Sequence, residues 1–204
     1  MVSIDKSKIY VFDDIIPSST QDVLEDKIGR LHFRYAINHH QKPFTIKVKN
    51  DPKIWNQNRH GLLQSYQFDE KEWTDASDPT YCTAVLNSLS QKLGHVLEIQ
   101  RIKINLNLKE HPENAGSCFH PHCDLNTDEW TAVYYVNQSD GDTLIFKERG
   151  MECLYEGKPI SIKKRIKNKK GRIVMFNQSL LHCAMTPFKS DYRVVINYNF
   201  KILT

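Results

Sequence analysis

The spacing of hydrophobic residues changes near residue 97, and the two parts of the chain predict different structures. Residues 21–31 place Val23, Leu24 and Ile28 on one helical face, after Ser and Thr residues able to cap a helix. A second helical pattern begins at residue 80, and its apolar stripe is formed by Val85, Leu86, Leu89, Leu93 and Val96. We expect these two helices to support a sheet.

From Arg101 onward the hydrophobic residues alternate, as in strands. Within 101–108 the polar face carries Lys103, Asn105 and Asn107, and can line a site or meet water. Further strand-like runs, separated by turn signals, cover 131–137, 144–146, 160–162, 172–176 and 193–200. Strands that follow one or two helices predict a mainly β protein with flanking helices, either a barrel or a jelly roll.

Bulk composition fits one ordinary soluble domain. The chain has 204 residues, of which 40% are hydrophobic, enough for one core. We expect a single domain over 1–204, with helical support and substrate loops in 1–97 and the β core in 98–204. No apolar run could span a membrane, and the charged N-terminus lacks the core of a signal peptide. Five cysteines without Cys-x-x-Cys spacing argue against disulfides, so we expect a cytoplasmic protein.

Charge permits an anionic partner without requiring one. The formal net charge is +4, and residues 157–171 are rich in lysine. That segment is a candidate contact for nucleic acid, but a solvated hairpin explains it better. The sequence carries no signal for an oligomeric state.

Candidate chemistry gathers at His122 and Asp124, which stand two apart and therefore share one face of a strand. With His182 far downstream they provide two imidazoles and a carboxylate, the ligand set of non-haem Fe(II) sites with open positions. A His-x-Asp pair alone also occurs by chance in loops. His120 forms a cupin-like His-x-His pair with His122, but the glutamate that cupins need is absent from the positions that follow.

Arg193 opens a strand in which Val194, Ile196, Tyr198 and Phe200 share the opposite face. Burying that apolar face against helices turns Arg193 toward the barrel interior. A buried guanidinium is costly unless it meets an anion, and its planar fork matches a carboxylate.

In their order along the chain, several motifs resemble the 2-oxoglutarate/Fe(II)-dependent dioxygenases, in particular the prolyl-4-hydroxylase-like branch with its small phage and bacterial members. The motifs are His122-x-Asp124, residues 130–137, Gly141-Asp-Thr143, residues 172–176, His182 and Arg193. The resemblance covers 100–204 well and the opening strand and helix faintly. It implies a double-stranded β-helix, or jelly roll, with Fe(II), 2-oxoglutarate and O2 as cofactors and co-substrates, and ascorbate as a candidate reductant.

The resemblance also implies roles for individual residues. His122, Asp124 and His182 match the iron ligands, and Arg193 matches the residue that pairs with the distal carboxylate of 2-oxoglutarate. Tyr135 matches a tyrosine that bonds the same carboxylate. Two positions depart from the pattern: Asn107, a candidate cofactor-binding residue, stands where relatives often carry a tyrosine, and Gly141-Asp142 replaces a glycine pair. We expect the latter change to alter a strand edge without touching the metal.

The implied function is hydroxylation of a C–H bond, with a prolyl or other amino-acid residue of a peptide or protein as substrate. A small-molecule substrate, the same chemistry on nucleic acid as oxidative dealkylation, and a non-catalytic metal-binding barrel are the alternatives. We expect loops 32–60, 109–119 and 125–130 to select the substrate.

Overall fold

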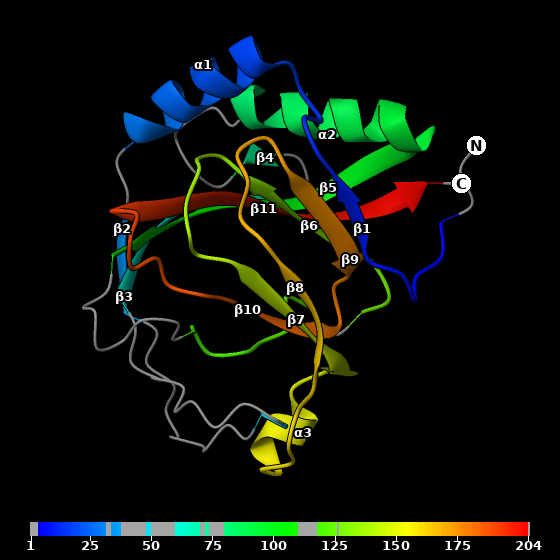
Figure 1. Ribbon diagram of the computed structural model, residues 1–204. Coiled ribbons are helices and arrows are strands. Elements are labelled where there is room, and N and C mark those ends of the chain that lie inside the picture. Colours follow the sequence, from blue (N-terminus) through cyan, green and yellow to red (C-terminus); the bar gives the residue numbers. More distant parts are fainter. Residues whose placement is uncertain are drawn as a thin grey trace.

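The structure, a computed structural model, describes residues 4–31, 34–37, 48–49, 60–69, 72–73, 80–109, 118–125 and 127–203. It is a mainly antiparallel β-structure with two helices packed on one side (Figure 1). The predicted fold class, a jelly roll flanked by helices, is confirmed. Of the loops expected to select the substrate, 32–60 and 109–119 lie largely outside the described residues, whereas 125–130 is described except for residue 126.

The described helices are α1 (Ser18–Gly29), α2 (Thr80–Leu93) and α3 (Glu152–Tyr155). The strands are β1 (Tyr10–Phe12), β2 (Arg34–Ile37), β3 (His60–Asp69), β4 (Glu72–Trp73), β5 (Val96–Leu108), β6 (Trp130–Tyr135), β7 (Thr143–Arg149), β8 (Ile162–Ile166), β9 (Ile173–Asn177), β10 (Leu180–Ala184) and β11 (Tyr192–Leu203). No helix among the described residues is long and apolar enough to cross a membrane.

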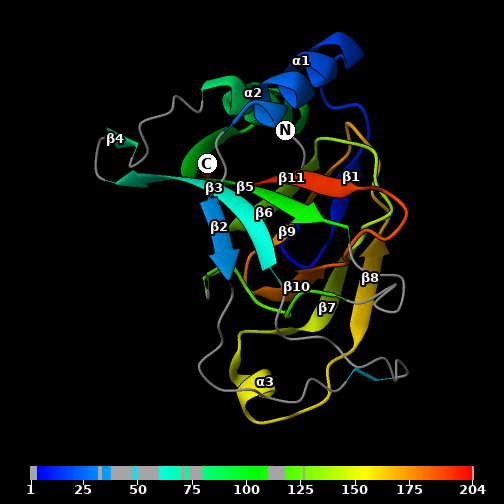
Figure 2. The ribbon, with the colours of Figure 1, turned by 90° about the vertical axis from the view of Figure 1, so that its left-hand side faces the viewer.

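The strands form two sheets. The larger has the order β1-β9-β6-β11-β5-β3-β2, with β4 paired to β3, and the smaller has the order β10-β7-β8. Figures 1 and 2 show the smaller sheet on the side of the larger one opposite to α1 and α2. Long pairings of β11 with β5 and with β6 form the centre of the larger sheet, and this centre supports the site described below.

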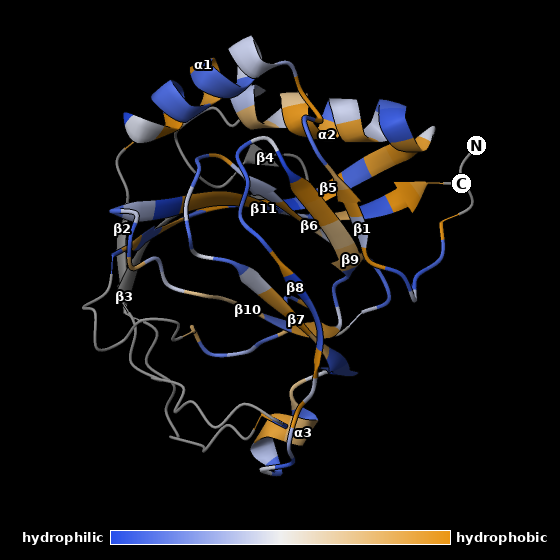
Figure 3. Ribbon diagram, in the orientation of Figure 1, coloured by the Kyte–Doolittle hydropathy of each residue, from blue (hydrophilic) through white to orange (hydrophobic). Residues whose placement is uncertain are grey.

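The main core lies between the larger sheet and the helices α1 and α2. It buries Leu24 and Ile28 of α1 and the α2 stripe against the outward face of β11. The phenol of Tyr198 donates to the carbonyl of Cys82 at 2.8 Å, which satisfies a buried hydroxyl and ties β11 to α2. In Figure 3 the hydrophobic colouring is strong on β9, whose five residues are all buried.

Three local predictions were wrong. Val96 does not extend the α2 stripe: it is 64% exposed and begins β5, because Gly94 with φ of 72° ends the helix first. No Ser or Thr side chain caps α1. Pro17 is the cap residue, and its carbonyl accepts from Thr20 N–H at 2.9 Å. The strand expected at 160–162 lies at 162–166, after the unpredicted helix α3.

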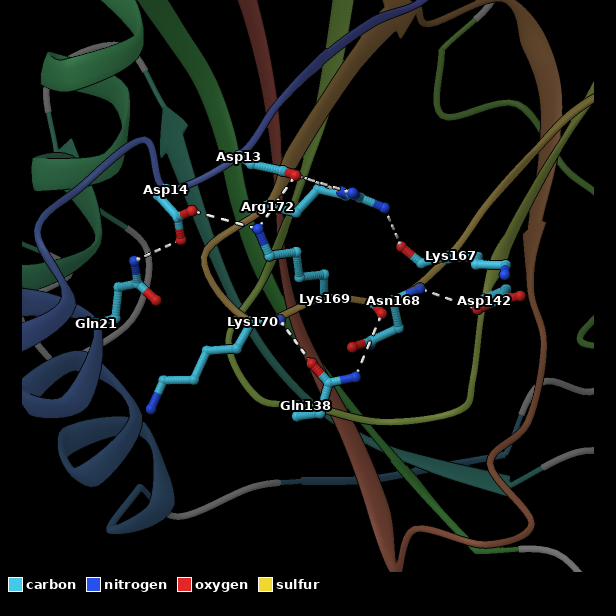
Figure 4. Close-up of polar contacts among 10 residues, drawn as sticks. All are labelled: Asp13, Asp14, Gln21, Gln138, Asp142, Lys167, Asn168, Lys169, Lys170 and Arg172. Atoms are coloured by element: carbon cyan, nitrogen blue, oxygen red, sulfur yellow. Dashed lines mark hydrogen bonds and ion pairs between the residues drawn. The ribbon is translucent and has the colours of Figure 1, made fainter.

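The lysine-rich segment is largely engaged within the protein. Lys169 Nζ and Arg172 Nε lie 3.2 and 2.6 Å from carboxylate oxygens of Asp13 (Figure 4). Lys170 Nζ lies 2.5 Å from Glu25 of α1. These cations attach the connection between β8 and β9 to β1 and α1, so much of the segment's positive charge is already balanced by carboxylates.

Candidate active site

Two histidines from distant parts of the chain meet as a bridged pair. The backbone N–H of His122 donates to the carbonyl of His182 at 3.0 Å, and the reverse bond measures 2.8 Å. Their ring centroids are 4.7 Å apart. Asp124 follows on the same side, and its Oδ2 lies 3.9 Å from His182 Nε2. One ligand atom from each of the three residues lies within 4.8 Å of the others.

Each histidine directs one ring nitrogen into the centre of the group. His122 Nδ1 lies 3.0 Å from the carbonyl of His120, and His182 Nδ1 lies 3.0 Å from the carbonyl of Leu180. A carbonyl only accepts, so each Nδ1 carries the proton and each Nε2 keeps its lone pair. His182 Nε2 is buried and has no hydrogen-bond partner among the described residues. Such a nitrogen is suited to a metal.

The protonation states of His122 and Asp124 also suit metal binding. Burial, and then the charge of His182, lower the pKa of His122 to about 4, so this imidazole is neutral at physiological pH. Burial raises the pKa of Asp124, but the two imidazoles and then Arg101 lower it by more, so that the net pKa lies well below its ordinary value. The centre therefore combines a carboxylate with a neutral imidazole.

Three donors fix the orientation of the Asp124 carboxylate, whose side chain is 4% exposed. Arg101 Nη2 on β5 donates to Oδ1 at 2.8 Å. Thr131 Oγ1 on β6 and Asn199 Nδ2 on β11 donate to Oδ2 at 2.7 and 3.0 Å. Donors from three adjacent strands thus hold a carboxylate that lies on an irregular segment.

The side chains of His122, Asp124 and His182 suit Fe(II). Two imidazoles and one carboxylate match the facial ligand set, and the buried Nε2 of His182 has no hydrogen-bond partner in the part of the chain that the structure describes. Among the described residues, this is the one group of three or more His, Cys, Asp or Glu side chains arranged to hold a metal ion.

Arg193 lies in the interior, 2% exposed. Its Nε donates to the carbonyl of Gly141 at 2.7 Å, Nη2 to Thr143 Oγ1 at 2.9 Å, and Nη1 to Asn107 Oδ1 at 3.2 Å. None of these acceptors carries a charge. Burial lowers the pKa of Arg193, although Tyr135 and Asp142 act in the opposite direction. Among the described residues no carboxylate lies within ion-pair distance of this guanidinium, so its desolvation is only partly offset.

Tyr135 lies at the same place. Its hydroxyl donates to Thr143 Oγ1 at 2.7 Å, and its ring centroid is 5.6 Å from Arg193 Cζ. Burial raises the pKa of Tyr135, so the phenol keeps its proton. Arg193, Tyr135 and Thr143 thus form a small cluster of donors around neutral oxygens.

The two departures from the family pattern both lie against Arg193. Asn107 accepts a hydrogen bond from the guanidinium instead of offering a phenol. At Gly141, a Cβ atom would lie 2.7 Å from Arg193 Cδ and 2.8 Å from the carbonyl of Met185. A side chain there would push against Arg193, so the glycine matters for this pocket as well as for the strand edge.

Sequence reasoning named the three clustered residues and Arg193, but it missed the residues that hold them in place. Arg101, Thr131 and Asn199 bind Asp124, and Thr143 bridges Arg193 with Tyr135. The signal that could have found Arg101 is its place on the alternating polar face of 101–107.

Comparisons with known proteins agree with this chemistry. Residues 106–201 match the sequence model of the 2OG-Fe(II) oxygenase superfamily. No match was found among curated proteins. The match covers slightly less than half of the chain, and the fold and the donor set agree with it, so the chain is similar to the 2OG-Fe(II) oxygenases, an enzyme class that uses Fe(II), 2-oxoglutarate and O2.

Solved structures share the fold at low identity. A 2OG-Fe(II) oxygenase family oxidoreductase from Burkholderia pseudomallei has a TM-score of 0.58 at 14% identity, covering 95% of this chain and 84% of the other. HygX from Streptomyces hygroscopicus, with nickel and 2-oxoglutarate bound, has a TM-score of 0.57 at 12%, covering 96% and 83%. A Trichoplax adhaerens prolyl hydroxylase in complex with a hypoxia inducible factor peptide has a TM-score of 0.53 at 12%, covering 95% and 83%.

Proposed function

We propose that this protein hydroxylates a C–H bond of a prolyl or other amino-acid residue, with His122, Asp124 and His182 as the ligands of Fe(II). Arg193 and Tyr135 would bind the distal carboxylate of 2-oxoglutarate. The observation that carries the proposal is a buried guanidinium whose hydrogen-bond partners among the described residues are all neutral, in the same fold as a His-Asp-His group. A structural metal would have no use for such a carboxylate clamp.

When bound, Fe(II) would supply O2 activation coupled to oxidative decarboxylation of the keto acid. The protein's own residues prepare that chemistry. The Asp124 carboxylate stays ionised, His122 stays neutral, and hydrogen bonds to backbone carbonyls fix both imidazole rings. Arg193 and Tyr135 orient the co-substrate by its far end. No side chain is needed as a general acid or base.

Two alternatives receive less support. In the nucleic-acid alternative the lysine-rich segment would contact phosphates. Lys169 and Lys170 are engaged by carboxylates, which leaves the exposed Lys163, Lys164 and Lys167 for such a contact. A non-catalytic barrel leaves Arg193 without a purpose. The peptide in the complex of the Trichoplax prolyl hydroxylase adds a reason to try peptides first. All five cysteines are free, which supports a cytoplasmic location. The single domain over 1–204 stays a prediction.

Succinate release tests the proposal. The Fe(II)-loaded protein should release succinate from 2-oxoglutarate, and a panel of prolyl peptides, free amino acids and nucleotides should identify the substrate class by stimulating release. His122→Ala should abolish release, because one of three ligands is lost. Full release by that variant would refute the ligand assignment, and stimulation by nucleotides alone would favour the nucleic-acid alternative.

A further inference from the structure

One face of β5 runs along the site. Side chains two apart on a strand share a face, so Arg101, Lys103, Asn105 and Asn107 form one row. Arg101 at one end binds Asp124, and Asn107 at the other end accepts from Arg193. Lys103 therefore lies in this row between Arg101, which contacts Asp124, and Asn107, which contacts Arg193. It is two residues from Arg101.

Lys103 has no role in either cluster. It is half-buried, and among the described residues its ammonium group makes no hydrogen bond or ion pair. Its pKa is lowered, by burial first and then by Arg101, while Asp124 acts in the opposite direction. In turn its charge contributes to lowering the pKa of His122. Lys103 lies two residues from Arg101 in this row, and the nearby Asp124 carboxylate already accepts from Arg101, Thr131 and Asn199, so among the described residues no carboxylate is paired with the ammonium.

Directly across from Lys103 on β11 stands Asn197. It is 8% exposed, and its Oδ1 is buried without a hydrogen-bond partner among the described residues. Residues paired in an antiparallel sheet share a face, so the two side chains are neighbours. The unused Oδ1 is an acceptor that the Lys103 ammonium can satisfy, whereas the Nδ2–H group of the same amide is the donor that can bind a carboxylate.

The neighbouring pairs in the same two strands behave differently. Arg101 and its partner Asn199 bond to each other at 2.9 Å and both bind Asp124. At the other end, Asn107 and its partner Arg193 bond to each other. Only the Lys103 pair combines a cation and an amide that the described residues leave without partners. The Lys103–Asn197 pair is therefore a polar position, held by two paired strands, on the face that carries the site.

We propose that Lys103 and Asn197 form a second anion-binding position that takes a carboxylate at the metal end of the pocket. The carboxylate comes either from the keto-acid end of 2-oxoglutarate or from the primary substrate. This inference rests on the proposed function and deepens it, since in the second case the substrate is an acid such as a free amino acid.

Ligand binding to the Ni(II)-loaded protein, which cannot turn over, tests the position by calorimetry. In the first arm 2-oxoglutarate is titrated into the protein. In the second arm, protein saturated with 2-oxoglutarate is titrated with charge-matched pairs: proline and prolinamide, glutamate and glutamine, aspartate and asparagine. The variants are Lys103→Met, which keeps the length of the side chain, and Lys103→Arg, which keeps its charge. Lys164→Met, at an exposed lysine of β8, is the matched control.

We expect Lys103→Met to weaken carboxylate binding about tenfold or more, since a charge-assisted hydrogen bond is lost, and Lys103→Arg to restore much of it. A loss confined to the first arm assigns the carboxylate to 2-oxoglutarate. A loss confined to the acid members of the second arm assigns it to the substrate. Nickel content and circular dichroism confirm that the variants are folded and loaded.

The inference is overturned if Lys103→Met binds 2-oxoglutarate like the wild type and also binds the acid members of the second arm as the wild type does. Failure of the proposed function looks different. In that case the wild-type Ni(II)-loaded protein would not bind 2-oxoglutarate at all, or would bind it equally well after Arg193→Met.

Discussion

Two sets of cations in this protein have opposite surroundings. The outer cations, Lys169, Lys170 and Arg172, each lie within 3.2 Å of a carboxylate oxygen of the same chain. The inner cations, Lys103 and Arg193, are more deeply placed and have no carboxylate partner among the described residues. The desolvation cost is greatest where the balancing charge is missing. We infer that the outer group has a structural role, and we propose that the inner group binds anions that come from outside the chain.

The largest effect should come from removing the innermost cation. Arg193→Met should weaken binding of 2-oxoglutarate to the metal-loaded protein by about a hundredfold or more, because a buried charge pair loses one member. Calorimetry with Ni(II)-loaded protein measures the change. Unchanged affinity would remove the distinction between the two groups.

Arg101 is an inner cation that does have an anion, namely the Asp124 carboxylate. We expect Arg101→Met to lower the affinity for the metal about 10- to 100-fold, the range found for groups that orient metal ligands. Arg101→Lys should restore part of the lost affinity for the metal. Metal titration of both variants separates this role from a general loss of folding, which would reduce the fraction of competent protein rather than its affinity.

The pH dependence of stability should report the inner region. Because the pKa of His122 is lowered to about 4 from an ordinary 6.5, the folded metal-free protein binds fewer protons here than the unfolded chain. The contribution of His122 to the free energy of unfolding is therefore present above about pH 6.5. It is lost as the pH falls toward 4, and the loss is at most about 3 kcal/mol. Urea unfolding across this range should show the decline, and His122→Gln should flatten it. An equal slope in both proteins would contradict the assignment.

The smallest effect should come from the outer group. Lys170→Met removes contacts with Asp22 and Glu25, yet partly exposed ion pairs contribute only about 0–1 kcal/mol. We expect a change in unfolding free energy within that range and no change in 2-oxoglutarate affinity. A large loss of affinity would mean that the outer cations serve the site.

Much of the site could be predicted because it follows from alternation along single strands. That pattern placed His122 beside Asp124 and turned Arg193 inward. Partners of these residues depend instead on the register between strands. Arg101 meets Asp124 only because β5 pairs with β11 so that Arg101 stands opposite Asn199, and nothing within either strand encodes that.

The wrong predictions have local causes. A Ser/Thr cluster indicated a side-chain cap for α1, but the carbonyl of Pro17 already accepts the first N–H groups. The apolar spacing of α2 continued through Val96, whereas Gly94 ends the helix through its positive φ. In both cases the backbone conformation of one residue outweighed a side-chain pattern.

The central claim is that one His-Asp-His group and one guanidinium together form a keto-acid site, and anaerobic binding of 2-oxoglutarate tests it most directly. Calorimetry should find one 2-oxoglutarate per chain in the Fe(II)-loaded protein, and binding should weaken strongly when Fe(II) is withheld or His122 is replaced by Ala. Equal affinity with and without the metal would contradict the account.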